Sequence, residues 1–235
     1  MKEDIKHSIF LFLNVVVVSV MSLILFVSLT FLNSVIFKGG YKAFVMNDKG
    51  KVVEQYTYNY DDGEDTKAAE LEDKGYSIQK SNFMSKTGET VDFIFFTAFS
   101  LIILFTFIYT KIYTIGNKDF NAVKCGHKPE DKLRGLRIGF MADIPYILFY
   151  VATLVSRFVK PSTSVGFYKI VNVNYFKIVN VAMGNKTLAN VSVIGYIVLF
   201  LLLFIVPLIS HISYTLGYKD IRISDKLKYK KGEIK

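Results

Sequence analysis

The chain lacks the residues that several common classes of protein depend on. It has no tryptophan, four prolines and a single cysteine, Cys125, in 235 residues. One cysteine excludes an internal disulfide framework. Cys125 and His127 have no second pair of ligands at zinc spacing, so we expect no metal site.

Catalytic signatures are missing as well. The sequence contains no G-x-S-x-G, no H-E-x-x-H, no Walker loop and no dinucleotide-binding fingerprint. Its three histidines, His7, His127 and His211, are scattered, and no two of them lie at helical ligand spacing. We therefore expect a protein that is not an enzyme and that binds no cofactor.

Long apolar runs dominate what is present. Hydrophobic residues make up 51% of the chain and gather in four blocks, 9–37, 93–110, 138–156 and 191–214. At ~1.5 Å per residue the first block is longer than a hydrocarbon layer of ~30 Å and can cross it with tilt, and the other three lie within the roughly 17–25 residues usual for a transmembrane helix. A lone segment in lipid satisfies its backbone only as a helix. The sequence predicts an all-α integral membrane protein with four transmembrane helices and a small extracytoplasmic α+β insert.

The distribution of lysine and arginine predicts the orientation. Segment 116–137 carries six of these residues and 217–235 carries seven, whereas 159–190 carries four and 38–90 mixes eight with ten acidic residues. Dense basic segments mark the cytoplasmic side. The predicted order is a cytoplasmic N-terminus with helix one (1–37), the outer insert (38–90), helix two (91–115), a basic inner loop (116–137), helix three (138–158), an outer interfacial segment (159–190), helix four (191–216) and a basic inner tail (217–235). We expect the plasma membrane, with both termini cytoplasmic.

The two outer segments have different patterns. The insert reads as two β-prone runs around a turn at 47–50, then a short helix and a third strand, which predicts a ββαβ unit. The outer interfacial segment contains the near-repeat KIVNV, whose β-branched residues favour a strand. On a helical wheel its lysines and asparagines share one side, which favours a helix lying in the interface plane. We prefer the helix.

Ionisable residues inside the apolar blocks are the candidate functional residues. Asp143 and His211 lie at similar predicted depth in helices three and four, and each is close to a proline, Pro145 or Pro207. Prolines kink helices and free a carbonyl on the preceding turn, here those of residues 141 and 203. An Asp143–His211 pair would suit proton or cation transport, or would simply fasten two helices.

Two weaker candidates and the functional alternatives complete the prediction. Asn14 could join the intramembrane pair, and Asp92 could pair with Arg157 at the outer rim.

The net charge of +9 lies beside the apolar blocks, which indicates anionic lipid headgroups rather than nucleic acid. We favour an accessory or interaction protein with a protein partner or a homo-oligomeric state. The alternative is a small oligomeric transporter or channel subunit that uses Asp143 and His211.

Overall fold

The computed structural model describes residues 2–47, 50–160, 162–163, 165–184 and 187–223. It divides into two compact units, one formed by 1–23 with 99–235 and the other by 24–98. The predicted tail, 217–235, lies outside the described residues from 224 onward, as do positions 48 and 49 of the predicted turn.

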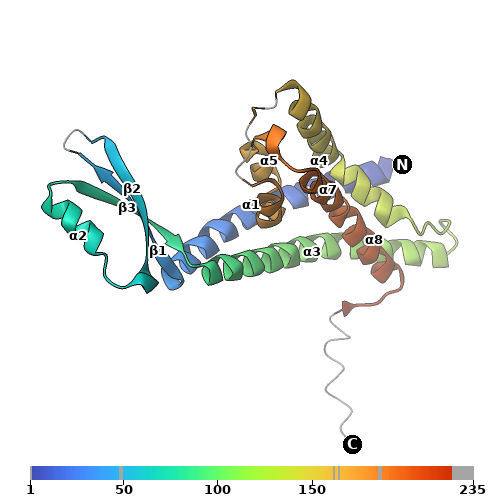
Figure 1. Cartoon of the computed structure of the whole chain (residues 1–235). Helices are drawn as coiled ribbons and strands as arrows, with labels where there is room; N and C mark the ends of the chain where they lie inside the picture. Colours follow the sequence, from blue (N-terminus) through green and yellow to red (C-terminus); the bar gives the residue numbers. More distant parts are fainter. Residues whose placement is uncertain (1, 48–49, 161, 164, 185–186, 224–235) are drawn as a thin grey trace, which may run out of the picture. The chain divides into compact units, whose positions relative to one another are not determined.

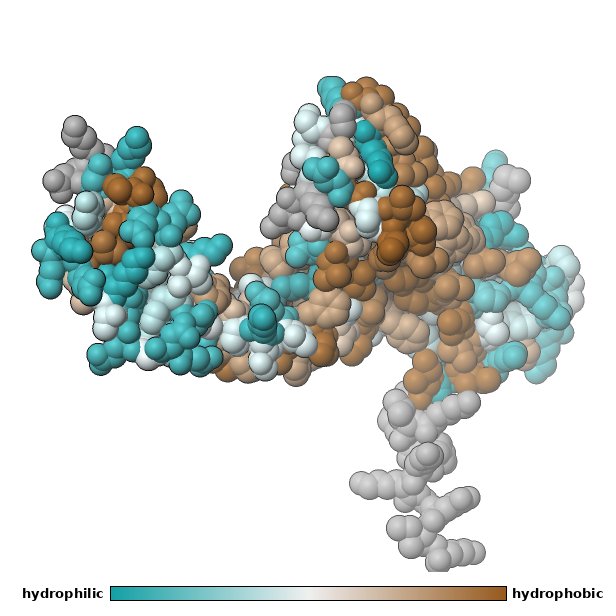
Figure 2. All heavy atoms as spheres, viewed as in Figure 1, coloured by the Kyte–Doolittle hydropathy of each residue, from teal (hydrophilic) through white to brown (hydrophobic). Residues whose placement is uncertain are grey.

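Four helices are long and apolar enough to cross a membrane, as predicted. They are α1 (Lys2–Ile36), α3 (Lys86–Lys124), α4 (Arg134–Val159) and the pair α7 (Val193–Leu202) with α8 (Ile205–Tyr218) (Figure 1). Many of their large apolar side chains are exposed, among them Ile24, Phe31 and Leu148. Figure 2 shows hydrophobic residues gathered over these helices, the surface that lipid would cover.

The second of these helices is longer than the sequence predicts. α3 continues to Lys124, so the first nine residues of the predicted loop 116–137 are helical. The extension packs closely on α8, because a Cβ added at Gly116 would stand 2.3 Å from the carbonyl oxygen of Tyr214. Helix–helix contact therefore stabilises a segment whose polar composition suggested a loop.

The fourth candidate span is interrupted near its proline. α7 ends at Leu202 and α8 begins at Ile205, and the turn between them lies just before Pro207. Proline has no N–H to donate to the carbonyl four residues earlier, which is that of Leu203. The helix is thus interrupted within five residues before Pro207, the position for which a kink was predicted. α4, by contrast, continues as a helix through Pro145.

The segment between α4 and α7 is helical rather than extended. It contains α5 (Gly166–Val171), the 3₁₀ turns η2 (Val173–Tyr175) and η3 (Leu188–Asn190), and α6 (Phe176–Met183). The single interfacial helix of the sequence prediction is broken at Asn172, and the lysines and asparagines do not share one outer face. Lys169 and Asn172 are buried. Lys169 Nζ donates to Asn180 Oδ1 at 2.7 Å, which explains how a lysine is buried here.

The smaller unit carries the predicted ββαβ order. β1 (Lys38–Met46), β2 (Val52–Asn59), α2 (Thr66–Asp73) and β3 (Ser77–Met84) follow one another, with a short turn, η1 (Tyr60–Asp62), after β2. The sheet order is β2-β1-β3 and both pairings are antiparallel. Asp65 caps α2 by accepting from the backbone N–H of Ala68 at 3.0 Å. Its other oxygen accepts hydrogen bonds from Tyr41 and Tyr56, which fixes α2 over one face of the sheet.

Candidate functional site

Two glycines on α4 bring α8 close to it and so set the position of Asp143. A Cβ at Gly135 would lie 2.4 Å from that of Tyr214, and a Cβ at Gly139 would lie 2.6 Å from Cα of Pro207. This small-xxx-small spacing lets two helix backbones approach closely. Asp143 follows one turn after Gly139 on α4, so it lies where α8 gives way to the break before Ile205.

The carboxyl group of Asp143 is buried and has no partner among the described residues. The residue is 4% exposed and its Oδ2 atom accepts no hydrogen bond. It lines a cavity of about 10 Å³ together with Asn172, Asn174, Tyr175 and the backbone break at Leu203. Two more residues that line the same cavity, Asn174 and Tyr175, each have a buried side-chain oxygen, Oδ1 and Oη, that also lacks a partner among the described residues. Such a concentration of unsatisfied buried acceptors is unusual in a folded protein.

Asn174 is held in place from two sides. Its side-chain Nδ2 atom donates to Ser19 Oγ of α1 at 2.9 Å, and its backbone carbonyl accepts from Ser100 Oγ of α3 at 2.9 Å. Ser100 also exchanges a hydrogen bond with Ser22 at 2.8 Å. Because the amide nitrogen is engaged by Ser19, the side-chain oxygen is the atom left for the cavity.

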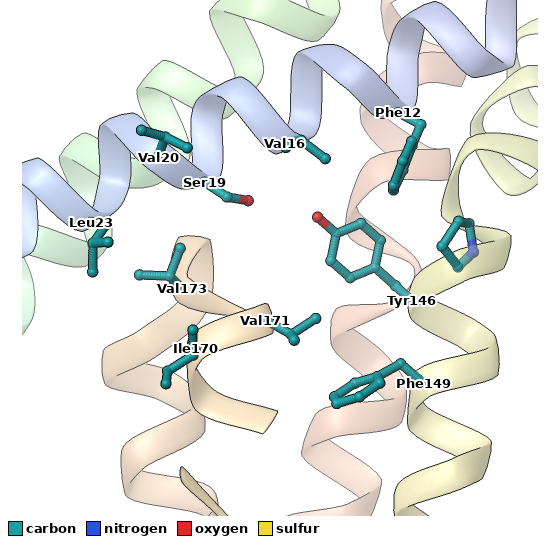
Figure 3. Close-up of a pocket in the computed structure, with 11 residues that line it drawn as sticks. Phe12, Val16, Ser19, Val20, Leu23, Tyr146, Phe149, Ile170, Val171 and Val173 are labelled. Carbon is teal, nitrogen blue, oxygen red and sulfur yellow. The ribbon is translucent and has the colours of Figure 1, made fainter. Parts of the chain in front are cut away.

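A wider apolar groove lies next to this cavity. It has a volume of about 410 Å³ and is bounded by α1, α4 and the segment around residues 170–173. Tyr146 lines both the groove and the Asp143 cavity. Figure 3 shows the hydroxyl of Tyr146 pointing toward Ser19 across the groove. Tyr146 therefore lies between the apolar groove and the residues with unpartnered buried oxygen atoms.

His211 does not share this site. It lines a different pocket, of about 560 Å³, with residues such as Glu130 and Tyr218. No hydrogen bond or ion pair in the described part of the chain joins it to Asp143. On α8 it is Pro207 and Ser210 that face α4, through Gly139, and the next position points elsewhere because successive helical residues are rotated by about 100°.

The remaining predicted residues are also separate from the cavity. From α1 it is Val15, not Asn14, that lines it. In the smaller unit, Asp92 is buried and accepts a hydrogen bond from Asn33 Nδ2 at 3.0 Å. In the larger unit, the guanidinium of Arg157 lies 5.0 Å from the centre of the Tyr196 ring. A pair between Asp92 and Arg157 would join the two units, and it stays a prediction.

A second group of buried charged residues was not recognised from the sequence. Arg134 is 4% exposed, and it donates to Asp4 Oδ1 at 2.7 Å and to both carboxylate oxygens of Asp119 at 2.6 Å. Lys128 and Tyr214 each donate to Asp119 at 2.8 Å. We call Asp4, Asp119, Lys128, Arg134, Arg137 and Tyr214 the Arg134 cluster. It connects α1, α3, α4 and α8.

The charges in the Arg134 cluster are mutually compensated. Asp4 precedes the first apolar block and Asp119 follows the second. Burial alone would raise the pKa of Asp4, but hydrogen bonds from Arg134 and Arg137 outweigh it and hold that pKa below its usual value. Burial acts the same way on Asp119, and Lys128, Arg134 and Tyr214 lower its pKa. Both groups are therefore carboxylates at neutral pH.

A basic pocket of about 770 Å³ adjoins the Arg134 cluster. Lysines from α1 and α3, namely Lys6, Lys111 and Lys118, line it together with His7 and His127. Basic pockets between apolar helices suit anionic headgroups. Binding of such lipids, expected from the position of the charges in the sequence, stays a prediction.

Comparison with known proteins gives no relative from which a role is transferred. No family model, curated protein or solved structure matches the chain.

Proposed function

We propose that this chain is an accessory or interaction protein of the membrane, and that its smaller unit binds an extended segment of a partner protein along strand β2. The observation that carries the proposal is that one edge of strand β2 is unpaired among the described residues. β2 lies at one edge of the sheet and, among the described residues, pairs with β1 alone. An unpaired strand edge is a ready template for another strand.

The sequence of β2 supports this role. Proteins usually protect edge strands with charged residues, especially lysine, with proline, with a β-bulge, or by keeping the strand very short. β2 has eight residues, VVEQYTYN, with neither lysine nor proline. Its register shift at Val53 lies near the start of the strand, and its one charged side chain, Glu54, is paired with Lys67. From Gln55 to Asn59 the β2 edge therefore carries neither a charge nor a bulge, whereas the opposite edge strand, β3, carries Lys80 in its middle.

One face of the sheet is also uncovered by its own unit. Tyr41, Ala43 and Val45 of β1 are buried on the side of α2. Side chains alternate along a strand, so Lys42 and Phe44 point to the other side. Their directly opposite neighbours on β2 are Thr57 and Gln55, and these are exposed. We call this side the open face.

A matched pair of variants tests the proposal. Gln55 and Thr57 on β2 lie opposite the same two β1 residues as Gln79 and Ser81 on β3. The full chain is purified from its native membrane in mild detergent, with mass spectrometry and light scattering. We expect Gln55→Lys/Thr57→Lys to lose the partner and Gln79→Lys/Ser81→Lys to keep it. Loss with both variants would place the partner on the open face, and retention with both would refute binding at the sheet.

The transporter alternative receives less support. The cavity at Asp143 has room for about one water-sized species, and His211 lines a different pocket. A continuous aqueous path would need a wider channel lined by both residues. If light scattering instead shows a homo-oligomer without a partner, the transporter alternative regains priority, with ion flux as its test.

The proposed topology keeps both termini in the cytoplasm and the smaller unit outside, with anionic lipids at the basic pocket. Cys125 is the single cysteine of the sequence and is exposed. A membrane-impermeant thiol reagent should label it only after permeabilisation. In a Cys125→Ser background, Asp62→Cys should be labelled in intact cells. The reverse labelling pattern would invert the topology.

A further inference from the structure

The cavity at Asp143 is lined by residues whose buried side-chain oxygens have no hydrogen-bond partner among the described residues. Asp143 Oδ2, Asn174 Oδ1 and Tyr175 Oη all lack hydrogen-bond partners, and each residue is more than nine-tenths buried. A buried carboxylate without compensation is costly, so its charge requires either a cation or a proton.

The break in the fourth span leaves one more backbone carbonyl without its helical donor, at a residue that lines the cavity. Leu203 lines the cavity, and Pro207 cannot donate to its carbonyl. Carbonyls released at a broken membrane helix are a common source of ligands for monovalent cations. The break and the acidic residue therefore lie at one place, on two different helices.

The composition of the cavity indicates the kind of ion. Carboxylate, amide, hydroxyl and carbonyl oxygens are hard ligands, which suit hard cations. Calcium sites usually contain several carboxylates, whereas Asp143 is the single acidic residue here. One negative charge matches a monovalent ion. The volume of about 10 Å³ accommodates one small species, which favours sodium over the larger potassium ion.

The site is also preorganised. Ser19 and Ser100, on α1 and α3, fix both ends of Asn174 through hydrogen bonds of 2.9 Å. Asp143 is fixed by the close α4–α8 contact at Gly139. Ligands that are held before binding lose less conformational entropy when the ion arrives.

We propose that this cavity binds a single sodium ion, with Asp143 supplying the charge and Asn174 and Tyr175 supplying neutral oxygen ligands. The carbonyl of Leu203 completes the set. The ion would lock α4, the α7–α8 break and the η2 turn together. The inference is independent of partner binding at β2, because it concerns residues of the other unit.

Thermal unfolding of the full-length protein in detergent tests this site. Melting curves are recorded in sodium, potassium and choline chloride at equal ionic strength, together with binding of radiolabelled sodium. Wild-type protein should show a saturable, sodium-specific rise in melting temperature of about 4 °C or more. Asp143→Asn should abolish both the rise and the bound label. Equal melting in all three salts, or a rise retained in Asp143→Asn, would overturn the proposal.

Two further variants keep the test decisive if Asp143→Asn folds poorly. Tyr175→Phe removes one ligand oxygen and keeps the ring, so it should shift the sodium midpoint to at least about tenfold higher concentration. Asp92→Asn removes a buried carboxylate from the other unit. It should lower the melting temperature in every salt but leave the sodium-dependent increment intact. An unchanged midpoint in Tyr175→Phe would overturn the assignment of Tyr175 as a ligand, and a melting temperature that follows pH but not sodium would assign the cavity to a proton instead.

Discussion

Asp143 lies nine positions after Arg134 on α4, and the carboxylates at these two places are compensated in different ways. Asp4 and Asp119 are surrounded by Arg134, Lys128 and a tyrosine hydroxyl. Asp143 is as deeply buried as Arg134, yet its Oδ2 atom has no partner in the described residues. A satisfied ionic network fastens helices. The unsatisfied acceptors around the Asp143 cavity instead leave hydrogen-bonding capacity for a bound ligand, here the proposed sodium ion.

Removing Arg134, the cation at the centre of the Arg134 cluster, should lower the stability of the protein more than any other change to these two regions. In Arg134→Met, Asp4 and Asp119 lose their shared partner while they remain buried. Truncating one side of a buried ionic network costs about 3–5 kcal/mol. We expect a loss of that size in the free energy of unfolding in detergent.

The control for Arg134→Met is Lys132→Met. The Lys132 side chain is 80% exposed and its amine is 3.9 Å from Glu130. Exposed pairs contribute at most about 1 kcal/mol, so this variant should melt close to wild type. Equal losses in the two variants would mean that the Arg134 cluster does not stabilise the helices.

Acidification should affect the Arg134 cluster next. The pKa values of Asp4 and Asp119 are lowered in the folded protein. Their stabilisation is therefore complete above the unfolded pKa of about 4 and is lost as the pH falls through the lower folded values. We expect the contribution of these two carboxylates to be lost below about pH 4, where the unfolding temperature should fall. An Arg134→Met protein should show a smaller acid-dependent drop, and an equal drop would assign the effect to other carboxylates.

The sequence predicted the elements whose signals are local. Four apolar blocks were sufficient to predict four spanning helices, and alternating β-prone runs with a short helical run predicted the ββαβ unit. Kinks were predicted at both prolines from the missing N–H, but the helix is interrupted near Pro207 and continuous through Pro145. These features required no knowledge of which side chains meet.

The site depended on contacts that no local pattern contains. Arg134 looked like one of six loop cations, since nothing in the sequence shows that Asp4, 130 residues earlier, packs against it. His211 was paired with Asp143 by depth, but rotation about the helix axis directs it to another pocket. Asn174 lies between the two copies of KIVNV, in a segment that the sequence predicted as an interfacial helix. The GLRIG spacing at 135–139 was a signal that could have placed α8 beside α4.

Separating α4 from α8 should disturb both regions at once. Gly139→Leu puts bulk where even a Cβ would stand 2.6 Å from the Pro207 backbone. Overpacking of this kind costs about 1–3 kcal/mol. We expect a lower melting temperature and a weaker sodium-dependent increment. Ala152→Leu, at an exposed position of the same helix, should change neither. A normal sodium increment in Gly139→Leu would show that the cavity does not depend on this contact.

Neutralising Asp143 should have the smallest effect on stability, and that contrast with Arg134→Met is the sharpest test of the comparison. Without sodium, the buried carboxyl group has no cation to compensate it in the described residues and is expected to hold a proton. Asparagine has nearly the same shape and is also neutral. In choline chloride, Asp143→Asn should therefore unfold within about 0.5 kcal/mol of wild type, as substitutions that break no interaction do. Chemical denaturation in that salt measures the difference. A loss of several kcal/mol would mean that Asp143 already has a strong partner, and its carboxylate would then belong to the same class as those around Arg134.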